Sequence, residues 1–242
     1  MDTIVLLMAK NQRLYTSDAM EKEKGRFTAA IAIALLLSFC GGYVEFWSVA
    51  RHGIFSGMET GNLITGVISW AEGDYSEMTY RFLAVGVFFL VSLLCEVIRR
   101  LLEKKNLRED LLMLALSAAT LVPAMFIEPT GVAPAFFLTG FCALQYSCFR
   151  SVKGLPYSTT MMTNLMTNFA KSIAGAFFER DRKSLFKVLE YFLIVAVFVG
   201  GVLSSHALVI QDYFDAYFLF IPFVITLACI PLDLYAYGIK AK

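Results

Sequence analysis

Histidine is nearly absent from this chain of 242 residues, and the common motifs of enzymatic chemistry are missing. The two histidines, His52 and His206, are far apart in the sequence and do not make a metal-binding set. No G-x-S-x-G, H-E-x-x-H, Walker or dinucleotide-binding motif occurs. An intramembrane enzyme would need a nucleophile with its base, or a metal pair. We therefore expect a protein that is not an enzyme and that uses no cofactor or metal ion.

Net charge is also small, at +1. A nucleic-acid-binding domain would present a basic face, so we expect no nucleic-acid partner. The five cysteines all fall inside apolar stretches. We interpret them as small buried hydrophobic side chains, because nothing in their spacing indicates a disulfide framework or a metal site.

The chain is rich in apolar residues, with 58% hydrophobic content and a mean hydropathy of +0.65. Soluble domains are nearer about 45–50% apolar, so the composition predicts an all-α integral membrane protein. A helix needs roughly 20 residues to cross a hydrocarbon core of about 30 Å. The stretches long and apolar enough to cross are 27–49, 82–98, 111–128, 134–149, 186–208 and 217–237. Residues 62–70 and 161–177 are too short or too polar, and are expected to be half-helices or re-entrant segments.

Lysine and arginine predict the orientation of these six crossings. The N-terminal segment, alternate loops and the C-terminal tail together carry eighteen basic residues, while the intervening loops carry only Arg51 and Arg81. Cytoplasmic loops hold the excess of positive charge, so both termini are expected in the cytoplasm.

A short segment occurs twice. Residues 59–65 (ETGNLIT) recur in degenerate form as residues 161–167 (MMTNLMT), 102 positions later. Three crossings separate the copies, so the second copy enters the bilayer from the opposite side. Inverted repeats with an interrupted polar segment at matching places are typical of small transporters and channels. We therefore expect a 3+3 inverted repeat, with residues 1–26 as a cytoplasmic segment, 27–128 as the first three-helix repeat and 129–242 as the second repeat with a cytoplasmic tail.

The chain resembles a known family in its motifs, which cover nearly the whole sequence: Gly41-Gly42-Tyr43-Val44-Glu45, Thr60-Gly61-Asn62-Leu63, Gly140, Gln145, Thr159-Thr160 and Thr163-Asn164-Leu165. The resemblance is to the YoaK-like family of bacterial membrane proteins, also called DUF1275. That family commonly has Asp at the position of Glu45 and Thr-Gly at the position of Thr163-Asn164. The resemblance implies a multi-spanning protein of the bacterial plasma (inner) membrane and brings no established activity.

Glu45 is the first candidate site residue, because it lies about two-thirds of the way along the first crossing. An ionised carboxylate at that depth costs roughly 2.5–3.5 kcal/mol on insertion scales, so it should face protein or water. One interpretation is a proton or cation site. The other is an interfacial residue that reaches the membrane surface or pairs with Arg51.

The repeated Thr-Gly-Asn and Thr-Asn elements are the second set of candidates. Thr60 or Asn62 could cap the free N–H groups at the start of a short helix, and Gly61 would allow close approach of another group. Such a helix start suits an anionic or carbonyl-bearing group. Thr163 and Asn164 would offer the same from the other half, so that the two helix ends converge near the midplane. The alternative is plain capping and close helix packing.

Gln145 completes the candidate site as an uncharged donor and acceptor inside the fourth crossing. One interpretation is that it lines a path for the solute, and the other is that it joins two helices by a hydrogen bond. Together these residues predict a transporter or channel for a small polar or anionic solute, bound between the two half-helices. The alternative is a non-transporting scaffold or sensor that binds a lipid or a partner protein. Expected partners are the solute and membrane lipid, with a homo-oligomer left open.

Overall fold

The computed structural model describes residues 28–105, 108–127, 131–148, 151–152, 155–156, 162–178, 182–209 and 217–237. The expected N-terminal segment, 1–26, lies outside these residues, as do Thr159 and Thr160. The described part is helical apart from one two-stranded antiparallel ladder, in which β1 (Ser151–Val152) pairs with β2 (Leu155–Pro156).

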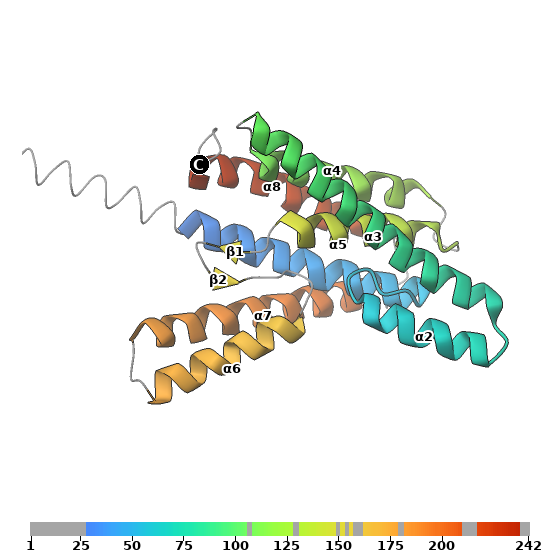
Figure 1. The fold of residues 1–242 in the computed structure, drawn as a ribbon, viewed down its shortest axis with the longest axis horizontal. Helices are drawn as coiled ribbons and strands as arrows, with labels where there is room; N and C mark the ends of the chain where they lie inside the picture. The colour runs from blue at the N-terminus through green and yellow to red at the C-terminus, as the bar shows by residue number, and fades with distance from the viewer. Residues whose placement is uncertain are drawn as a thin grey trace, which may run out of the picture.

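The helices follow the expected hydrophobic stretches closely (Figure 1). In chain order they are the first helix (Thr28–His52), α2 (Glu59–Ala71), α3 (Tyr75–Lys104), α4 (Glu109–Phe126), α5 (Ala133–Cys148), α6 (Met162–Phe178), α7 (Arg182–Val209), the 3-10 turn η1 (Tyr217–Leu219) and α8 (Phe220–Tyr237).

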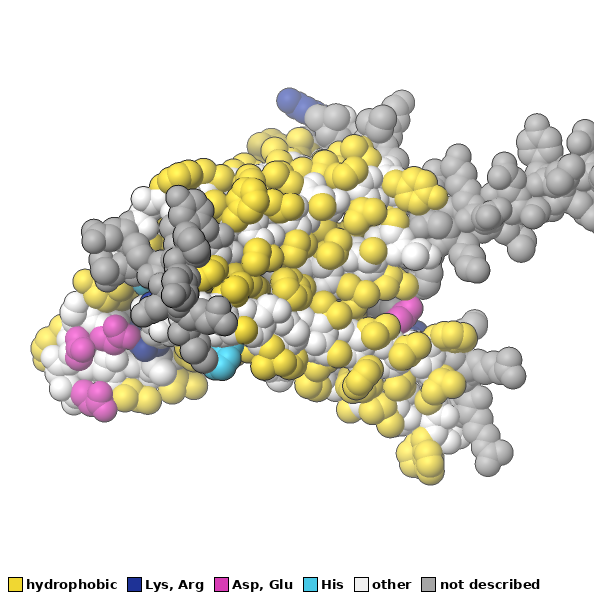
Figure 2. Space-filling view, turned by 180° about the vertical axis from the view of Figure 1, so that it is seen from behind, with side chains coloured by type: hydrophobic (Ala, Val, Ile, Leu, Met, Phe, Trp, Pro, Cys, Tyr) yellow, Lys and Arg dark blue, Asp and Glu magenta, His cyan; other side chains and the backbone are white. Residues whose placement is uncertain are grey.

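Among the described residues, four helices are long and apolar enough to cross a membrane: the first helix, α3, α4 and the stretch Ser184–Val209 of α7. Large apolar side chains cover the outside of the molecule, as Figure 2 shows for one face. Phe89 of α3, for example, is 65% exposed. Exposing apolar surface to water costs about 25 cal/mol per Å², whereas contact with lipid chains carries no such cost. The chain is therefore a multi-pass, membrane-embedded protein.

The other two expected crossings correspond to α5, which has 16 residues, and to α8, whose apolar stretch Phe220–Ala236 is shorter than the four helices above. Both helices occupy the ranges in which a crossing was expected. The count of six crossings stays a prediction for these two helices.

The half-helix prediction matches α2 in length. At about 1.5 Å per residue, its 13 residues span about 20 Å, which is too short for a crossing. Its apolar side chains point outward, Ile64 and Trp70 both being 58% exposed, while Asn62, Gly66 and Ser69 are buried. α2 folds back against α3, and α6 folds back in the same way against α7 (Figure 1).

The first helix is the centre of the structure, and 61% of the residues in its most apolar 18-residue stretch are buried. It packs closely against α7, because the residues at the point of contact between the two helices are glycines, which have no side chain. A Cβ on Gly42 would collide with the carbonyl oxygen of Phe198, and a Cβ on Gly201 would collide with that of Phe39. Small residues commonly allow membrane helices to approach in this way. The first helix also packs against α5, η1 and α8, and Tyr43 donates its hydroxyl to the carbonyl oxygen of Phe218 in η1 at 2.9 Å.

A buried ion pair joins α4 to α8. Arg108, directly before α4, binds Asp110 at 2.6 Å and also the carboxylate of Asp233 in α8. The side chains of Arg108 and Asp233 are 4% and 1% exposed. The buried positive charge of Arg108 is therefore balanced by the buried negative charge of Asp233, as a stable buried ion pair requires.

Helix lengths agree only partly between the two halves. The last two helices of each half have similar lengths, 30 and 18 residues against 28 and 18. The first two differ, with 25 and 13 residues against 16 and 17. The 3+3 inverted repeat itself remains a prediction.

Candidate functional site

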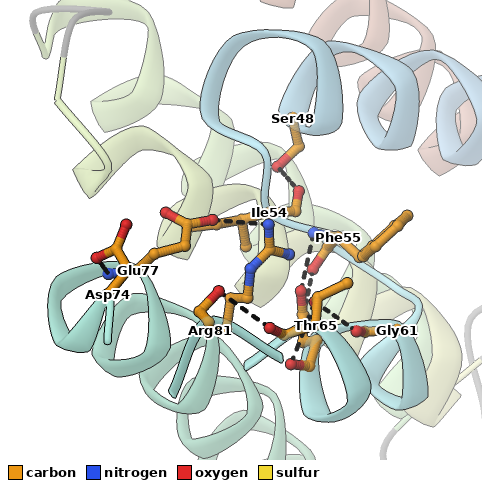
Figure 3. A network of polar contacts seen from close by, with 10 residues as sticks. Ser48, Ile54, Phe55, Gly61, Thr65, Asp74, Glu77 and Arg81 are labelled. Carbon is orange, nitrogen blue, oxygen red and sulfur yellow. Dashed lines mark hydrogen bonds and ion pairs between the residues drawn. The ribbon is translucent and has the colours of Figure 1, made fainter. Parts of the chain in front are cut away.

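The candidate site surrounds the loop 53–58, which connects the first helix to α2. The turn begins at Gly53, whose φ of 68° is a left-handed conformation that glycine adopts without strain. Ser48, near the end of the first helix, donates its hydroxyl to the carbonyl oxygen of Ile54 at 2.8 Å (Figure 3). Ile54 is 0% exposed, and buried backbone groups must find their hydrogen bonds within the protein, so this side-chain contact holds the loop in place.

Asn62 fixes the middle of this loop. Its side chain accepts from the backbone N–H of Phe55 at 3.0 Å and donates to the carbonyl oxygen of Phe55 at 2.7 Å. Asn62 is 0% exposed. The amide thus forms hydrogen bonds with both the N–H and the carbonyl oxygen of Phe55, as the backbone of a paired β-strand would. Its nitrogen also donates to Glu59 at 3.3 Å.

The capping prediction for this segment is wrong. α2 begins at Glu59, and its N-cap residue Met58 makes no side-chain capping hydrogen bond. Thr60 is exposed, and the side chain of Asn62 binds the backbone of Phe55 and the Glu59 carboxylate, not the free N–H groups at the start of the helix. Gly61 is required for packing, because a Cβ there would lie 2.9 Å from the ring of Phe55.

Two carboxyl groups lie beside the loop. Glu45 of the first helix accepts from the backbone N–H of Gly57 at 2.8 Å through Oε2, and Glu59 accepts from Asn62 through Oε2. The other oxygen of each, Oε1, is buried without a hydrogen-bond partner among the described residues. The two carboxylates are close enough for their charges to repel each other.

Ser56 adds a third unsatisfied group to this site. Its backbone N–H lies at the Glu45 carboxylate, its side chain is fully buried, and its hydroxyl has no partner in the described part of the chain. A carboxyl pair with a hydroxyl can hold a proton or a small cation between its oxygens. It is unfavourable for an anion, since Glu59 occupies the first turn of α2 where an anion would bind.

Gln145 lies on the face of α5 that packs against the first helix. Phe141 and Cys142 share that face and belong, with Val44 next to Glu45, to the apolar core around the first helix. Gln145, one turn further along α5, is 0% exposed, and neither of its amide atoms has a partner among the described residues. An unsatisfied amide is therefore buried at the interface between α5 and the first helix, the helix that carries Glu45.

The second set of candidates does not join this site. Thr163 and Asn164 are exposed in the first turn of α6, and the buried residue of that turn is Leu165. α2 and α6 lie at opposite ends of the molecule (Figure 1). Each short helix folds back onto the long helix that follows it, so the expected convergence of Asn62 with Asn164 is absent from this structure.

Arg81 of α3 lies against the loop from the other side (Figure 3). It binds Glu77 at 2.6 Å, and its Nη2 is 3.5 Å from the position of a Cβ on Gly53. Its side chain is 12% exposed, and Nε and Nη1 are buried with no partner in the part of the chain that is described. The sequence pattern predicts Arg81 only as a charge that sets the topology, and it does not identify Glu59 as a site residue. Glu59 is the first residue of the repeated segment 59–65, and this position is the feature of the sequence that could have identified it.

The described residues contain no group of three His, Cys, Asp or Glu side chains that could hold a metal ion. The family model described as "Protein of unknown function (DUF1275)" matches residues 33–232. Comparison with curated proteins gives no match, and comparison with solved structures gives none either.

Proposed function

Since the chain belongs to the DUF1275 family, whose description names no activity, we propose from its own residues that it is a membrane transporter or channel for a small polar solute. A proton or small cation is the solute that the site fits best. In this proposal the protein lies in the bacterial plasma membrane with both termini in the cytoplasm, and it is not an enzyme. Its two halves are inverted repeats, each with one half-helix.

The observation that carries the proposal is the carboxyl pair. Glu45 and Glu59 each keep one buried oxygen unsatisfied beside a loop whose backbone is hydrogen-bonded at Phe55 and Gly57. A buried unsatisfied polar group costs about 1–3 kcal/mol, and a carboxylate within the membrane costs several. Ionisable groups at that depth are therefore functional candidates, and two of them within mutual reach form a binding site for positive charge.

The route follows from the neighbours of this pair. The 53–58 loop covers the carboxyl groups and is held by side chains that a conformational change can release, namely Ser48 and Asn62. On the inner side, Cys142 and Gln145 continue along the interface between α5 and the first helix. We infer that the loop is the gate at this end and that the Gln145 amide is the next polar contact for the solute.

Reconstituted flux tests this function. The full chain would be placed in liposomes with a trapped pH-sensitive dye, and a potassium diffusion potential would drive proton entry; sodium uptake would be followed separately. Wild type should exceed empty liposomes for at least one of the two ions. Glu45→Gln keeps the shape and removes the charge, so it should lower that flux about tenfold or more, as expected for a lost hydrogen bond to a charged group.

Glu103→Gln is the matched control, because Glu103 is a 58% exposed carboxylate at the far end of α3. It should transport as wild type does. Flux through wild type no greater than through empty liposomes for either ion would contradict the proposal and favour the scaffold or sensor. Equal flux through wild type and Glu45→Gln would place the route elsewhere.

A further inference from the structure

A hollow of about 400 Å³ lies between α3 and α4, outside the carboxyl site. It is lined by α3 from Val91 to Ile98, by α4 from Leu116 to Pro123, and by Phe137 and Leu144 of α5. We call it the α3–α4 groove. Its volume is within the range of about 300–1,000 Å³ that is usual for small-molecule sites. Its lining is apolar apart from Thr120, so it suits a hydrocarbon chain and no polar solute.

Small residues keep this groove open. α3 and α4 both pack against α5, through Cys95 and Met113 around Leu144. At Gly140 of α5, an added Cβ would meet nothing nearer than Thr120 Cγ2 at 3.8 Å. Ala119 is an exposed lining residue of α4. Larger side chains at 119 or 140 would fill space that is empty in this fold.

One end of the groove reaches the level of the lipid headgroups. α3 has 30 residues, about 45 Å, and is therefore longer than the hydrocarbon core of about 30 Å. The groove ends at Ile98, and the following residues are strongly charged. Lys105, the residue directly after α3, follows Ile98 by seven positions, about two helical turns.

Charge at this end is balanced. Residues 96–110 contain five basic and four acidic side chains, and Asp233 adds a carboxylate through its pairing with Arg108. Arg99 is already bound to Glu96 at 2.6 Å and to Glu103 at 3.1 Å. Since no excess of positive charge remains, this end does not select an anionic headgroup.

Glu109 offers an acceptor at the same end. It opens α4 and lies seven positions before Leu116, hence on the groove side of that helix. Its charge interacts with that of Arg99 across the gap between α3 and α4. Its Oε2 is buried without a hydrogen-bond partner among the described residues. An ammonium group would satisfy this oxygen, and Lys105 can bind a phosphate.

We propose that the α3–α4 groove binds one acyl chain of a zwitterionic phospholipid whose headgroup carries a primary ammonium, with the ammonium at Glu109 and the phosphate at Lys105. The inference does not depend on the transport activity.

Native mass spectrometry of the purified full chain in detergent tests this site. Phosphatidylethanolamine, phosphatidylcholine and phosphatidylglycerol would be titrated separately. Wild type should bind one phosphatidylethanolamine, with the other two weaker by about tenfold, because a quaternary ammonium donates no N–H and glycerol carries no charge. Glu109→Gln should remove most of the preference for phosphatidylethanolamine over phosphatidylcholine.

Variants that fill the groove with a large side chain give a second test of the proposal. Ala119→Trp should abolish tight binding of all three lipids, while Ala115→Trp, an exposed alanine one turn earlier on α4 that does not line the groove, should leave binding unchanged. Gly140→Leu fills the groove from α5 and repeats the test if Ala119→Trp does not fold. Unchanged binding in a folded groove-filling variant, tighter binding of phosphatidylglycerol, or a wild-type dimer that Ala119→Trp dissociates would each overturn the proposal.

Discussion

Asn62 and Phe55 are joined by a reciprocal pair of hydrogen bonds, in which the buried side-chain amide of Asn62 binds both the N–H and the carbonyl oxygen of Phe55. The 53–58 loop therefore depends on one side chain for two of its backbone hydrogen bonds. That loop in turn gives Glu45 its hydrogen bond from Gly57. The position of the carboxyl site is thus coupled to Asn62.

Asn62→Leu should destabilise the protein by about 2–4 kcal/mol. It keeps the approximate size of the side chain but leaves the N–H and carbonyl of Phe55 without partners, at about 1–3 kcal/mol for each. The free energy of unfolding, measured with a denaturant in mixed micelles, should fall accordingly. Asn164→Leu is the matched control at the repeated position, where the side chain is exposed, and its effect should be within about 0.5 kcal/mol. Equal losses in the two variants would contradict the role of Asn62.

Gly201→Ala should separate the first helix from α7. The new Cβ would collide with the backbone carbonyl of Phe39, which cannot rotate away as a side chain could. A loss of about 3 kcal/mol is expected, at the upper end of the range for overpacking. The neighbouring Gly200 has open space where its Cβ would be, so Gly200→Ala should be neutral or slightly stabilising. The midpoint of thermal unfolding in detergent distinguishes the two, and a similar midpoint for both variants would show that the crossing tolerates a methyl group.

Hydrophobic patterning predicted the helical membrane fold, because length and apolar content are local properties of the chain. The first helix, α3, α4 and α7 lie where the apolar runs predicted crossings. The boundaries were less accurate: α3 extends from Tyr75 to Lys104, well beyond the apolar core at 82–98, because its polar ends remain helical outside the hydrocarbon.

The candidate site was predicted only in part, since a sequence pattern does not show which backbone groups a side chain meets. Glu45 and Asn62 were identified, but the partner of Asn62 is a loop backbone whose path depends on the packing of Phe55 against Gly61. Asn164 repeats Asn62 in the sequence and not in its environment, because Leu165 is the residue that α6 buries.

The central claim is that Glu45 and Glu59 form one binding site for the transported ion, and a double-mutant cycle on reconstituted flux tests it most directly. If they act together, Glu59→Gln should lower the flux about as much as Glu45→Gln, and the double variant should be no worse than either single variant, because groups that act as a unit are strongly non-additive. Wild-type flux through Glu59→Gln, or losses in the double variant equal to the product of the single losses, would contradict the claim.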